Sequence, residues 1–252
     1  MKIFDANTWI GQWPFAFLKV HTARSLAQEL LAHGISRALV SPLDAVFAPE
    51  PGPANRDLLR TTRKVGQLVP VPVINPMLGN WREELALYSA DPRVRAVRIL
   101  PPYHNYRLSH RAVEELGSEL VRRQLRLIVQ VRLIDERHEY HALSIKPVAT
   151  TDLESLTKRQ PLLPVLASGL LRSEVRSLLP KTPRLLADLS FAEWHDTLPH
   201  LLDNIPARQL AFASHTPFLI TAAARAKLDT SRIPATKRAA IAESNLQRFL
   251  GL

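Results

Sequence analysis

The sequence predicts an α/β fold, a single (β/α)8 barrel, and three observations carry that prediction. The chain has 252 residues, and barrels of this kind typically need about 250. Short apolar runs alternate with segments of helical period along the whole chain, as in a parallel sheet with crossover helices. Eight such apolar runs can be counted. We therefore expect one domain that covers residues 1–252.

The predicted strands and helices follow one another in strict alternation. The expected strands are residues 3–6, 37–41, 69–74, 94–100, 127–133, 162–167, 185–188 and 209–213. The expected helices are residues 22–33, 55–66, 81–89, 109–124, 152–159, 173–179, 191–202, 217–228 and 236–250. Thr22 is a suitable N-cap for the first helix, and Gly34 is a suitable end for it.

Composition points to a globular protein of ordinary type. Hydrophobic residues make up 46% of the chain and charged residues 22%, which is the balance of a folded soluble domain. No apolar run approaches the roughly 18 to 20 residues that cross a bilayer. The chain has no cysteine, so disulfides and thiolate metal sites are excluded. We expect a cytoplasmic protein without a membrane partner.

The net charge of +10 raises the question of an acidic partner or nucleic acid. The arginines are dispersed, however, and no basic groove interleaved with aromatic residues is present. A solvated basic surface is the better interpretation, so nucleic acid is not an expected partner. A small anionic ligand stays open, and a homo-oligomer is compatible with the sequence.

Three segments, in order along the chain, carry a family signature. Residues 3–11 read Ile-Phe-Asp-Ala-Asn-Thr-Trp-Ile-Gly, residues 212–218 read Phe-Ala-Ser-His-Thr-Pro-Phe, and residues 244–252 read Ser-Asn-Leu-Gln-Arg-Phe-Leu-Gly-Leu. They resemble the opening Asp-x-His-x-His-x-Gly, the Phe-Gly-Ser-Asp-x-Pro-Phe and the Asn-x-x-Arg-Leu-Phe-Gly-Leu patterns of the amidohydrolase-related family. Residues 94–101 resemble its Gly-x-Lys-x-x-Pro pattern, with Arg98 at the lysine. The resemblance implies the barrel fold.

The same resemblance implies a divalent metal, and this sequence departs from the pattern at each position that would hold it. In the family, two N-terminal histidines, a histidine after strand five, a histidine after strand six and an aspartate after strand eight hold the metal. The residues at these positions are Asn7, Trp9, Arg132, Ser168 and His215. An indole cannot ligate a divalent ion, and an arginine repels one. We therefore expect no cofactor of the usual kind.

Candidate functional residues lie where active sites of barrels lie, at the C-terminal ends of the strands. His215 is the candidate acid or base, oriented by Asp5 or Asp188. Arg98 and Arg132 are candidates to clamp a carboxylate or phosphate. The other candidate substrate-binding residues are Asn7, His104, Gln130, Asp135 and Ser168. A structural interpretation stands beside each of these: Asp5 satisfying backbone donors, the arginines pairing with Asp5, Asp135 or Asp188, and His215 only hydrogen-bonded.

The sequence thus favours a hydrolase or lyase that acts on a small, anionic substrate without the family's metal. One alternative is a non-catalytic barrel that binds a ligand or a protein through the same pocket, since fold does not imply function. A second alternative is a metallohydrolase with zinc on a rearranged set of ligands, drawn from His104, His138, His141 and His215.

Overall fold

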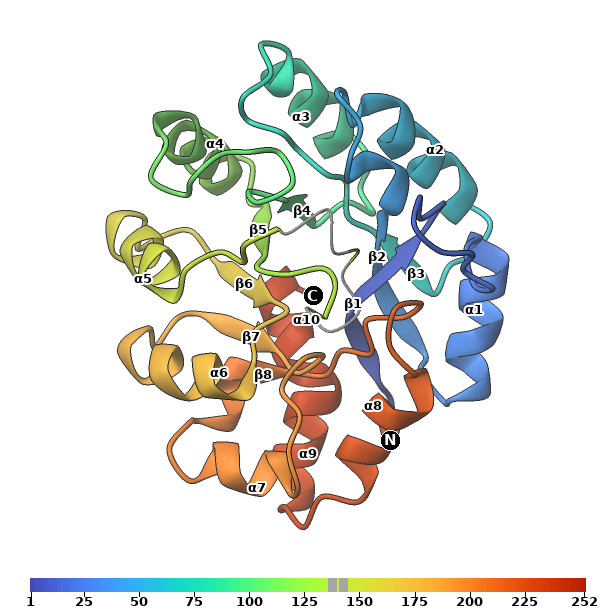
Figure 1. Cartoon of the computed structure of the whole chain (residues 1–252), viewed down its shortest axis with the longest axis vertical. Coiled ribbons are helices and arrows are strands. Elements are labelled where there is room, and N and C mark those ends of the chain that lie inside the picture. Colours follow the sequence, from blue (N-terminus) through green and yellow to red (C-terminus); the bar gives the residue numbers. More distant parts are fainter. Residues whose placement is uncertain (136–139, 141–144) are drawn as a thin grey trace.

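The computed structural model describes residues 1–135, 140 and 145–252. Within these residues, eight parallel strands form the wall of a barrel and the helices lie around its outside (Figure 1). The predicted (β/α)8 fold is confirmed. The strands are β1 (Phe4–Ile10), β2 (Arg37–Pro42), β3 (Leu68–Pro70), β4 (Ala96–Ile99), β5 (Arg126–Gln130), β6 (Val165–Ser168), β7 (Leu186–Asp188) and β8 (Leu210–Ala211).

Backbone hydrogen bonds close the barrel between two regular ladders. Strands β1 to β3 form one ladder and strands β4 to β8 form the other. An isolated parallel bridge between Val73 and Arg98 joins the two on one side, where Ile74 N donates to Arg98 O at 2.9 Å. On the other side, Ala6 N donates to Phe212 O at 2.9 Å. The wall is therefore continuous around the barrel.

Strand β3 is shorter than the predicted run 69–74 because prolines interrupt it. Pro70 and Pro72 have no N–H to donate to a neighbouring strand. The ladder between β2 and β3 ends at the pair Val40 and Pro70. The carbonyl of Pro72 still accepts from Arg98 N at 2.8 Å, so the segment remains in the wall although it is not a regular strand.

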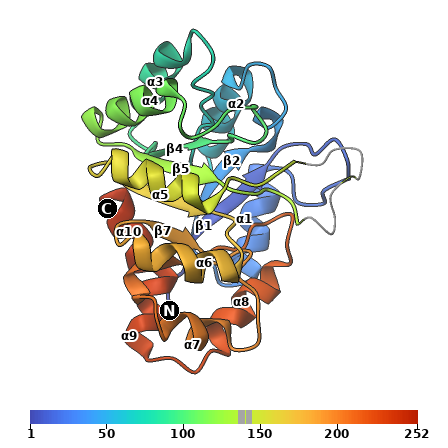
Figure 2. The same cartoon turned by 60° about the vertical axis from the view of Figure 1, so that its left-hand side comes forward.

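Helices α1 to α7 connect successive strands along the outside of the barrel, as expected for crossover connections, and helices α8 to α10 follow the last strand. They are α1 (Ala23–Ala32), α2 (Gly52–Thr62), α3 (Trp81–Ser89), α4 (Arg111–Arg122), α5 (Thr150–Arg159), α6 (Arg172–Leu178), α7 (Thr197–Leu202), α8 (Thr221–Asp229), α9 (Ala235–Ala239) and α10 (Asn245–Leu250). Figure 2 shows α4, α5 and α6 one after another along the outside of strands β4 to β7. Thr22 caps α1 as predicted. No helix in the described part of the chain is long and apolar enough to cross a membrane.

Four helical predictions differ from the structure. Helix α2 spans Gly52–Thr62 instead of residues 55–66, and α8 begins at Thr221 instead of residue 217. The helix expected from residue 191 begins only at Thr197, because residues 191–196 form irregular turns. The closing helix, expected as one piece from 236 to 250, contains a π-helical turn, η5 (Ala240–Ser244). The carbonyl of Ile241 in this turn accepts from Phe212 N at 2.8 Å. The closing helix therefore supplies a hydrogen bond just beyond the two-residue strand β8.

Apolar side chains form two layers, one inside the barrel and one outside it. The outer layer lies between the strands and helices and includes Val97 and Ile99 of β4. The inner layer includes Ala96 of the same strand, as the alternation of strand side chains requires. Leu246 and Leu250 of α10 belong to this inner layer. The N-terminal half of the barrel interior is thus filled and covered by α10.

A bulge in β1 changes which of its side chains point inward. The β1 and β2 register pairs Asp5 with Ala38 but Thr8 with Val40, so β1 carries one extra residue. Ala6 lies in the inner apolar layer below the bulge. Above it, Asn7 and Trp9 contact Arg98, an inward side chain of β4. Bulges commonly re-aim side chains in this way beside functional sites.

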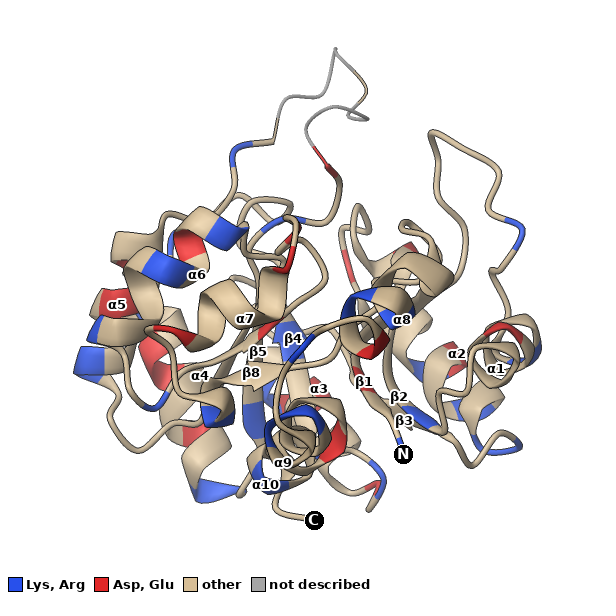
Figure 3. Ribbon diagram, turned by 90° about the horizontal axis from the view of Figure 1, so that it is seen from below, with Lys and Arg blue, Asp and Glu red and all other residues tan. Residues whose placement is uncertain are grey.

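Charged side chains are spread over the outside of the molecule. Figure 3 shows Lys and Arg on helices around the barrel, interspersed with Asp and Glu. Many of them form ion pairs, such as Arg82 with Glu115 at 2.5 Å and Arg159 with Glu114 at 2.7 Å. This distribution agrees with the dispersed arginines of the sequence.

Candidate functional site

Polar side chains fill the C-terminal half of the barrel interior. Each of the following is fully buried, with none of its surface exposed: Asp5, Asn7, Arg98, Gln130, Ser168, Asp188 and His215. They come from strands β1, β4, β5, β6 and β7 and from the residues after β8. We call Asn7, Arg98, Gln130 and His215 the central cluster, because hydrogen bonds connect these four. The structure therefore brings seven of the ten predicted site residues into one buried region.

The hydrogen bonds of the central cluster run in a defined direction. Arg98 Nη1 donates to Asn7 Oδ1 at 2.7 Å and to Gln130 Oε1 at 2.5 Å. Because the Asn7 oxygen accepts from a cation, the Asn7 Nδ2 faces His215 Nδ1, at 2.7 Å, and donates to it. His215 Nε2 then donates to Leu133 O at 2.6 Å. The proton of the neutral imidazole therefore lies on Nε2.

Contacts of both its backbone and its ring fix the position of His215. The backbone N–H donates to Asn7 O at 2.9 Å, and the φ of 57° is in the left-handed region that residues other than glycine seldom adopt. The ring packs against Phe191 and Phe218, with centroids 5.0 and 5.4 Å away. Burial lowers the pKa of His215 to about 4. The ring is therefore neutral at pH 7, and proton transfer at either nitrogen requires an existing hydrogen bond to break.

Two buried carboxylates flank the central cluster and differ in how they are satisfied. Asp188 accepts from Ser168 Oγ, from Ser190 Oγ at 2.6 Å and from the Ser190 and Gly169 N–H groups at 3.1 and 3.3 Å. Asp5 accepts from Asn7 N at 3.0 Å and from Ser214 N at 3.1 Å. Burial raises the pKa of Asp5 to about 7, although these hydrogen bonds oppose the shift. Asp5 is thus the group whose proton affinity is best matched to neutral pH.

Arg98 is the cation at the centre of the barrel. Its guanidinium carbon lies 4.3 Å from the centroid of the Trp9 ring, a cation–π contact. Burial lowers the pKa of Arg98 to about 9, and the charges of Asp188 and Asp5 oppose that shift. Its Nε and Nη2 have no hydrogen-bond partner. The charge is therefore held by neutral groups and one aromatic face, without a direct ion pair to a described residue.

The remaining predicted residues lie away from the central cluster. Arg132 binds Glu174 of α6 with both terminal nitrogens, at 2.6 and 2.9 Å, and also donates to Gly169 O at 2.7 Å. His104 Nε2 donates to Ala45 O at 3.2 Å. Asp135 is half-buried at the edge of the described residues. His138 and His141, candidates for a rearranged metal site, lie outside the described residues.

Aromatic rings cover the mouth of the barrel above the central cluster. We call Trp13, Phe15, Phe47 and Phe218 the aromatic roof. The ring of Trp13 has its centroid 5.1 Å from that of Phe218, 5.4 Å from that of Phe47 and 5.6 Å from that of Phe15. Phe218 in turn stacks on His215. Phe15 and Phe47 remain 44% and 39% exposed, so the outer side of the roof presents aromatic surface to solvent.

The donor set at the five metal positions of the resemblance does not suit a divalent cation. Trp9 lies against Arg98, Ser168 donates to Asp188, and both nitrogens of His215 are engaged. Arg132 and Arg98 bring two positive charges to the same end of the barrel, and a bound cation would be repelled by them. Among the described residues, no group of three or more His, Asp or Glu side chains could hold a metal ion.

Several residues of this region were not predicted. Glu174 as the partner of Arg132 and Leu133 O as the acceptor for His215 could not be inferred, since each contact joins residues that are 42 and 82 positions apart in the sequence, respectively. Ser190 was more accessible to prediction: an Asp followed two residues later by Ser often forms a local turn in which the carboxylate accepts backbone and hydroxyl donors. Asp188 and Ser190 make that turn.

Comparison with solved structures confirms the fold. The chain matches no protein-family model and no curated protein sequence. Its fold is similar to a 2,6-dihydroxybenzoate decarboxylase in complex with 2,6-dihydroxybenzoate, with TM-score 0.79 and 13% identity over 100% of this chain and 99% of that one. It is also similar to the 5-carboxyvanillate decarboxylase of Sphingomonas paucimobilis, with TM-score 0.77 and 12% identity over 100% and 99%.

A third neighbour is a dihydroxybenzoic acid decarboxylase from Polaromonas sp. JS666 with bound manganese and the inhibitor 2-nitroresorcinol. It has TM-score 0.73 and 13% identity over 100% of this chain and 97% of that one. Identities this low establish the fold alone. The architecture expected from the amidohydrolase-related resemblance is thereby confirmed, and the chemistry has to be argued from the residues of this chain.

Proposed function

We propose that the protein is a lyase or hydrolase that acts on a small anionic substrate at the C-terminal end of its barrel. The substrate class that we propose first is the aromatic carboxylic acids. Arg98 binds the anionic group, and the aromatic roof contacts the ring. Asp5 is the group proposed to transfer the proton, with His215 and Asp188 beside it. The family's divalent metal takes no part in this proposal.

One observation carries the proposal: a cation, two carboxylates and an imidazole are buried together inside the barrel. Burying a charge costs several kcal/mol even when it is paired, and apolar side chains of similar volume are often as stable or more stable. A barrel kept only as a scaffold gains nothing from such a cluster. Functional sites, by contrast, are where pKa values are strongly shifted by burial, as those of Asp5, Arg98 and His215 are here.

The fold neighbours supply the substrates to test. Those described above are decarboxylases whose names specify dihydroxybenzoates and 5-carboxyvanillate. These are planar aromatic acids, which match an arginine beneath an aromatic roof. A panel of hydroxybenzoates assayed for CO2 release, and of aryl esters and amides assayed for hydrolysis, separates a lyase from a hydrolase.

Variants make the assay decisive. Asp5→Asn keeps the size of the side chain and removes its titration, so turnover should fall at least a hundredfold, as is typical when a general acid or base is lost. Arg95→Lys, a change at an exposed residue just before β4, is the control and should leave turnover unchanged. Turnover that survives in Asp5→Asn would overturn the assigned role, and absence of turnover across the panel would overturn the proposed class.

A second candidate function is ligand binding without turnover. It is favoured by one observation: the acid–base groups are already satisfied, since both nitrogens of His215 and both oxygens of Asp188 are hydrogen-bonded. A ligand that binds only the native state raises the melting temperature by mass action. Stabilisation by aromatic acids with no product after prolonged incubation would identify this function.

The zinc alternative is tested separately. Elemental analysis of protein purified without chelator is expected to show less than about one-tenth equivalent of zinc, manganese, iron or nickel, because the five positions of the metal pattern offer no suitable donor set. A stoichiometric metal would bring His138 and His141 back into consideration.

A further inference from the structure

We propose that the Nε and Nη2 edge of Arg98 is the receptor for one planar carboxylate group inside the barrel. The inference rests on the proposed function for the site that it describes, but it concerns binding and does not require turnover. It assigns the recognition of the anion to one edge of one side chain and excludes Arg132 from that role.

The first step is the geometry of the guanidinium group. Its five N–H bonds lie in one plane and form three edges. In Arg98, Nη1 makes both hydrogen bonds of the group, to Asn7 Oδ1 and Gln130 Oε1. Nε–H and the neighbouring Nη2–H form the adjacent edge, and neither nitrogen has a partner. Two parallel N–H donors at this spacing match the two oxygens of a carboxylate.

The second step is that the rest of the guanidinium is held still. Asn7 and Gln130 fix Nη1 from two different strands, and the Trp9 ring covers one face at 4.3 Å. The plane of the group is therefore set before a ligand arrives. A preorganised edge loses little rotamer entropy on binding, which favours affinity.

The charge of Arg98 also favours a bound anion. No described carboxylate pairs directly with Arg98: Asp188 is occupied by two hydroxyl groups and two backbone N–H groups, and Asp5 by two backbone N–H groups. Leaving a buried donor without a partner costs about 1–3 kcal/mol, and more for a charged group. A bound carboxylate would remove this penalty at both nitrogens and place a negative charge directly beside a cation whose nearest charged residues, Asp188 and Asp5, do not pair with it.

Arg132 shows the contrasting arrangement. Its two terminal nitrogens are already bound by the carboxylate of Glu174, which forms two parallel hydrogen bonds with them. Glu174 therefore already occupies the position on Arg132 that an external carboxylate would take. An external anion would have to displace Glu174 from Arg132, whereas at the free edge of Arg98 it breaks no hydrogen bond of the guanidinium.

A titration of the native protein tests the inference directly. The probes are sodium formate and sodium benzoate, with chloride and inorganic phosphate at equal ionic strength. The readout is the 1H–15N signal of Arg98 Nε, assigned by its loss in Arg98→Lys. Formate and benzoate should move this signal in a saturable way, and the signal of the exposed Arg95 Nε, just before β4, should stay in place.

The benzoate affinity of a variant at Arg98 gives a second test. Arg98→Lys keeps the positive charge but removes the paired edge, so benzoate affinity measured by calorimetry should fall at least tenfold, which corresponds to about 1.4 kcal/mol. Equal shifts with chloride would show that the site recognises charge rather than the planar carboxylate, and would overturn the inference. So would an Arg98 Nε signal that no carboxylate moves, a measurement that does not depend on the variant folding.

The outcomes also separate this inference from the proposed function. Carboxylate binding at Arg98 without turnover would support the inference and contradict the proposed reaction. Turnover with a KM that is unchanged in Arg98→Lys would support the reaction and contradict the inference.

Discussion

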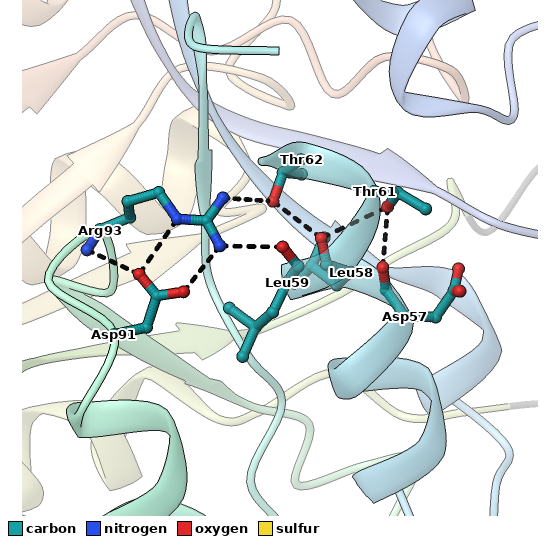
Figure 4. A network of polar contacts seen from close by, with 7 residues as sticks. All are labelled: Asp57, Leu58, Leu59, Thr61, Thr62, Asp91 and Arg93. Carbon is teal, nitrogen blue, oxygen red and sulfur yellow. Dashed lines mark hydrogen bonds and ion pairs between the residues drawn. The ribbon is translucent and has the colours of Figure 1, made fainter. Parts of the chain in front are cut away.

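Two arginines that bracket the start of strand β4 hold their charges in opposite ways. Arg93 lies before the strand and is fully engaged (Figure 4): it binds both oxygens of Asp91, at 2.6 and 3.0 Å, and donates to Thr62 Oγ1 and Leu59 O. Arg98 lies five residues later, inside the barrel. Within residues 1–135, 140 and 145–252, its side chain donates through Nη1 alone, to two neutral oxygens.

The two arginines also differ in how their hydrogen-bond donors are used. Arg93 fastens the end of α2 to the turn before β4, and its guanidinium holds the pKa of Asp91 below the usual value. Its donors are used up by the protein. Arg98 is more deeply buried, where an unmade hydrogen bond is more costly, yet it keeps an edge unused. This unused edge is the basis of the carboxylate-binding role that we propose for Arg98.

The largest expected effect is the difference in benzoate binding between two variants, in which either Arg98 or Arg93 is replaced by methionine. Arg98→Met should weaken benzoate binding at least a hundredfold, because two charge-assisted hydrogen bonds of about 1.5–3 kcal/mol each are lost. It should also destabilise the fold by about 3 kcal/mol, since Asn7 and Gln130 lose their donor. Arg93→Met should leave benzoate binding unchanged. Calorimetry and urea unfolding measure both effects, and equal binding losses in the two variants would erase the distinction.

The second effect is a pH dependence of stability that arises from two buried residues inside the barrel, Asp5 and His215. The pKa of Asp5 is raised from 3.8 to about 7, so its contribution to stability is complete below pH 3.8 and is lost as pH rises to 7. The pKa of His215 is lowered from 6.5 to about 4, so its contribution is complete above pH 6.5 and is lost as pH falls to 4. Between pH 4 and 6.5 the two contributions oppose each other.

Asp5→Asn should expose the His215 contribution. Relative to the native protein, the stability of the variant should rise by about 3 kcal/mol from pH 4 to 6.5, at about 1.4 kcal/mol per unit of pKa shift. Urea midpoints measured across this range check the prediction. Parallel curves for the variant and the native protein would mean that Asp5 has an ordinary pKa.

The third effect tests the connection between Arg98 and His215. Asn7→Ala removes the amide that accepts from one and donates to the other, and the expected loss of stability is about 2 kcal/mol. The 15N shifts of His215 should also change, because Nδ1 loses its donor. A loss below about 0.5 kcal/mol, the size of an ordinary surface change, would show that the amide is dispensable.

The smallest expected effect comes from the hydrogen bonds around Arg93. Thr62→Val removes the hydroxyl that accepts from Arg93 at 3.1 Å and donates to Leu58 O at 2.7 Å. The expected loss is about 1 kcal/mol, because Arg93 keeps Asp91. Benzoate affinity should not change at all, and any change would mean that the two regions are coupled.

Most of the fold could be predicted from the sequence because it depends on local patterns. The alternation of apolar runs and helical segments located all eight strands, and Thr22 located the start of α1. The errors were local too: Pro70 and Pro72 shortened β3, and the π-helical turn at residues 240–244 has no signal in an otherwise helical pattern. The bulge in β1 was also missed, although it decides that Asn7 and Trp9 point inward.

The site was predictable as a list of residues but not as an arrangement. Strand ends identified Asn7, Arg98 and His215, since topology brings such positions together. Whether Arg98 or Arg132 has a free edge depends on Glu174, which is 42 residues from Arg132 along the chain. That separation leaves no trace in the sequence. The catalytic roles of His215, Asp5 and Asp188 stay predictions for the assays above.

Helix α10 covers the N-terminal end of the barrel, opposite the central cluster. Leu246 and Leu250 fill that end together with the inner apolar layer. A ligand that binds Arg98, as we propose, should therefore enter from the opposite end, where Trp13 and Phe218 pack against each other. Substitutions of Trp13, in the aromatic roof, are then expected to change the dissociation rate of such a ligand more than its equilibrium affinity.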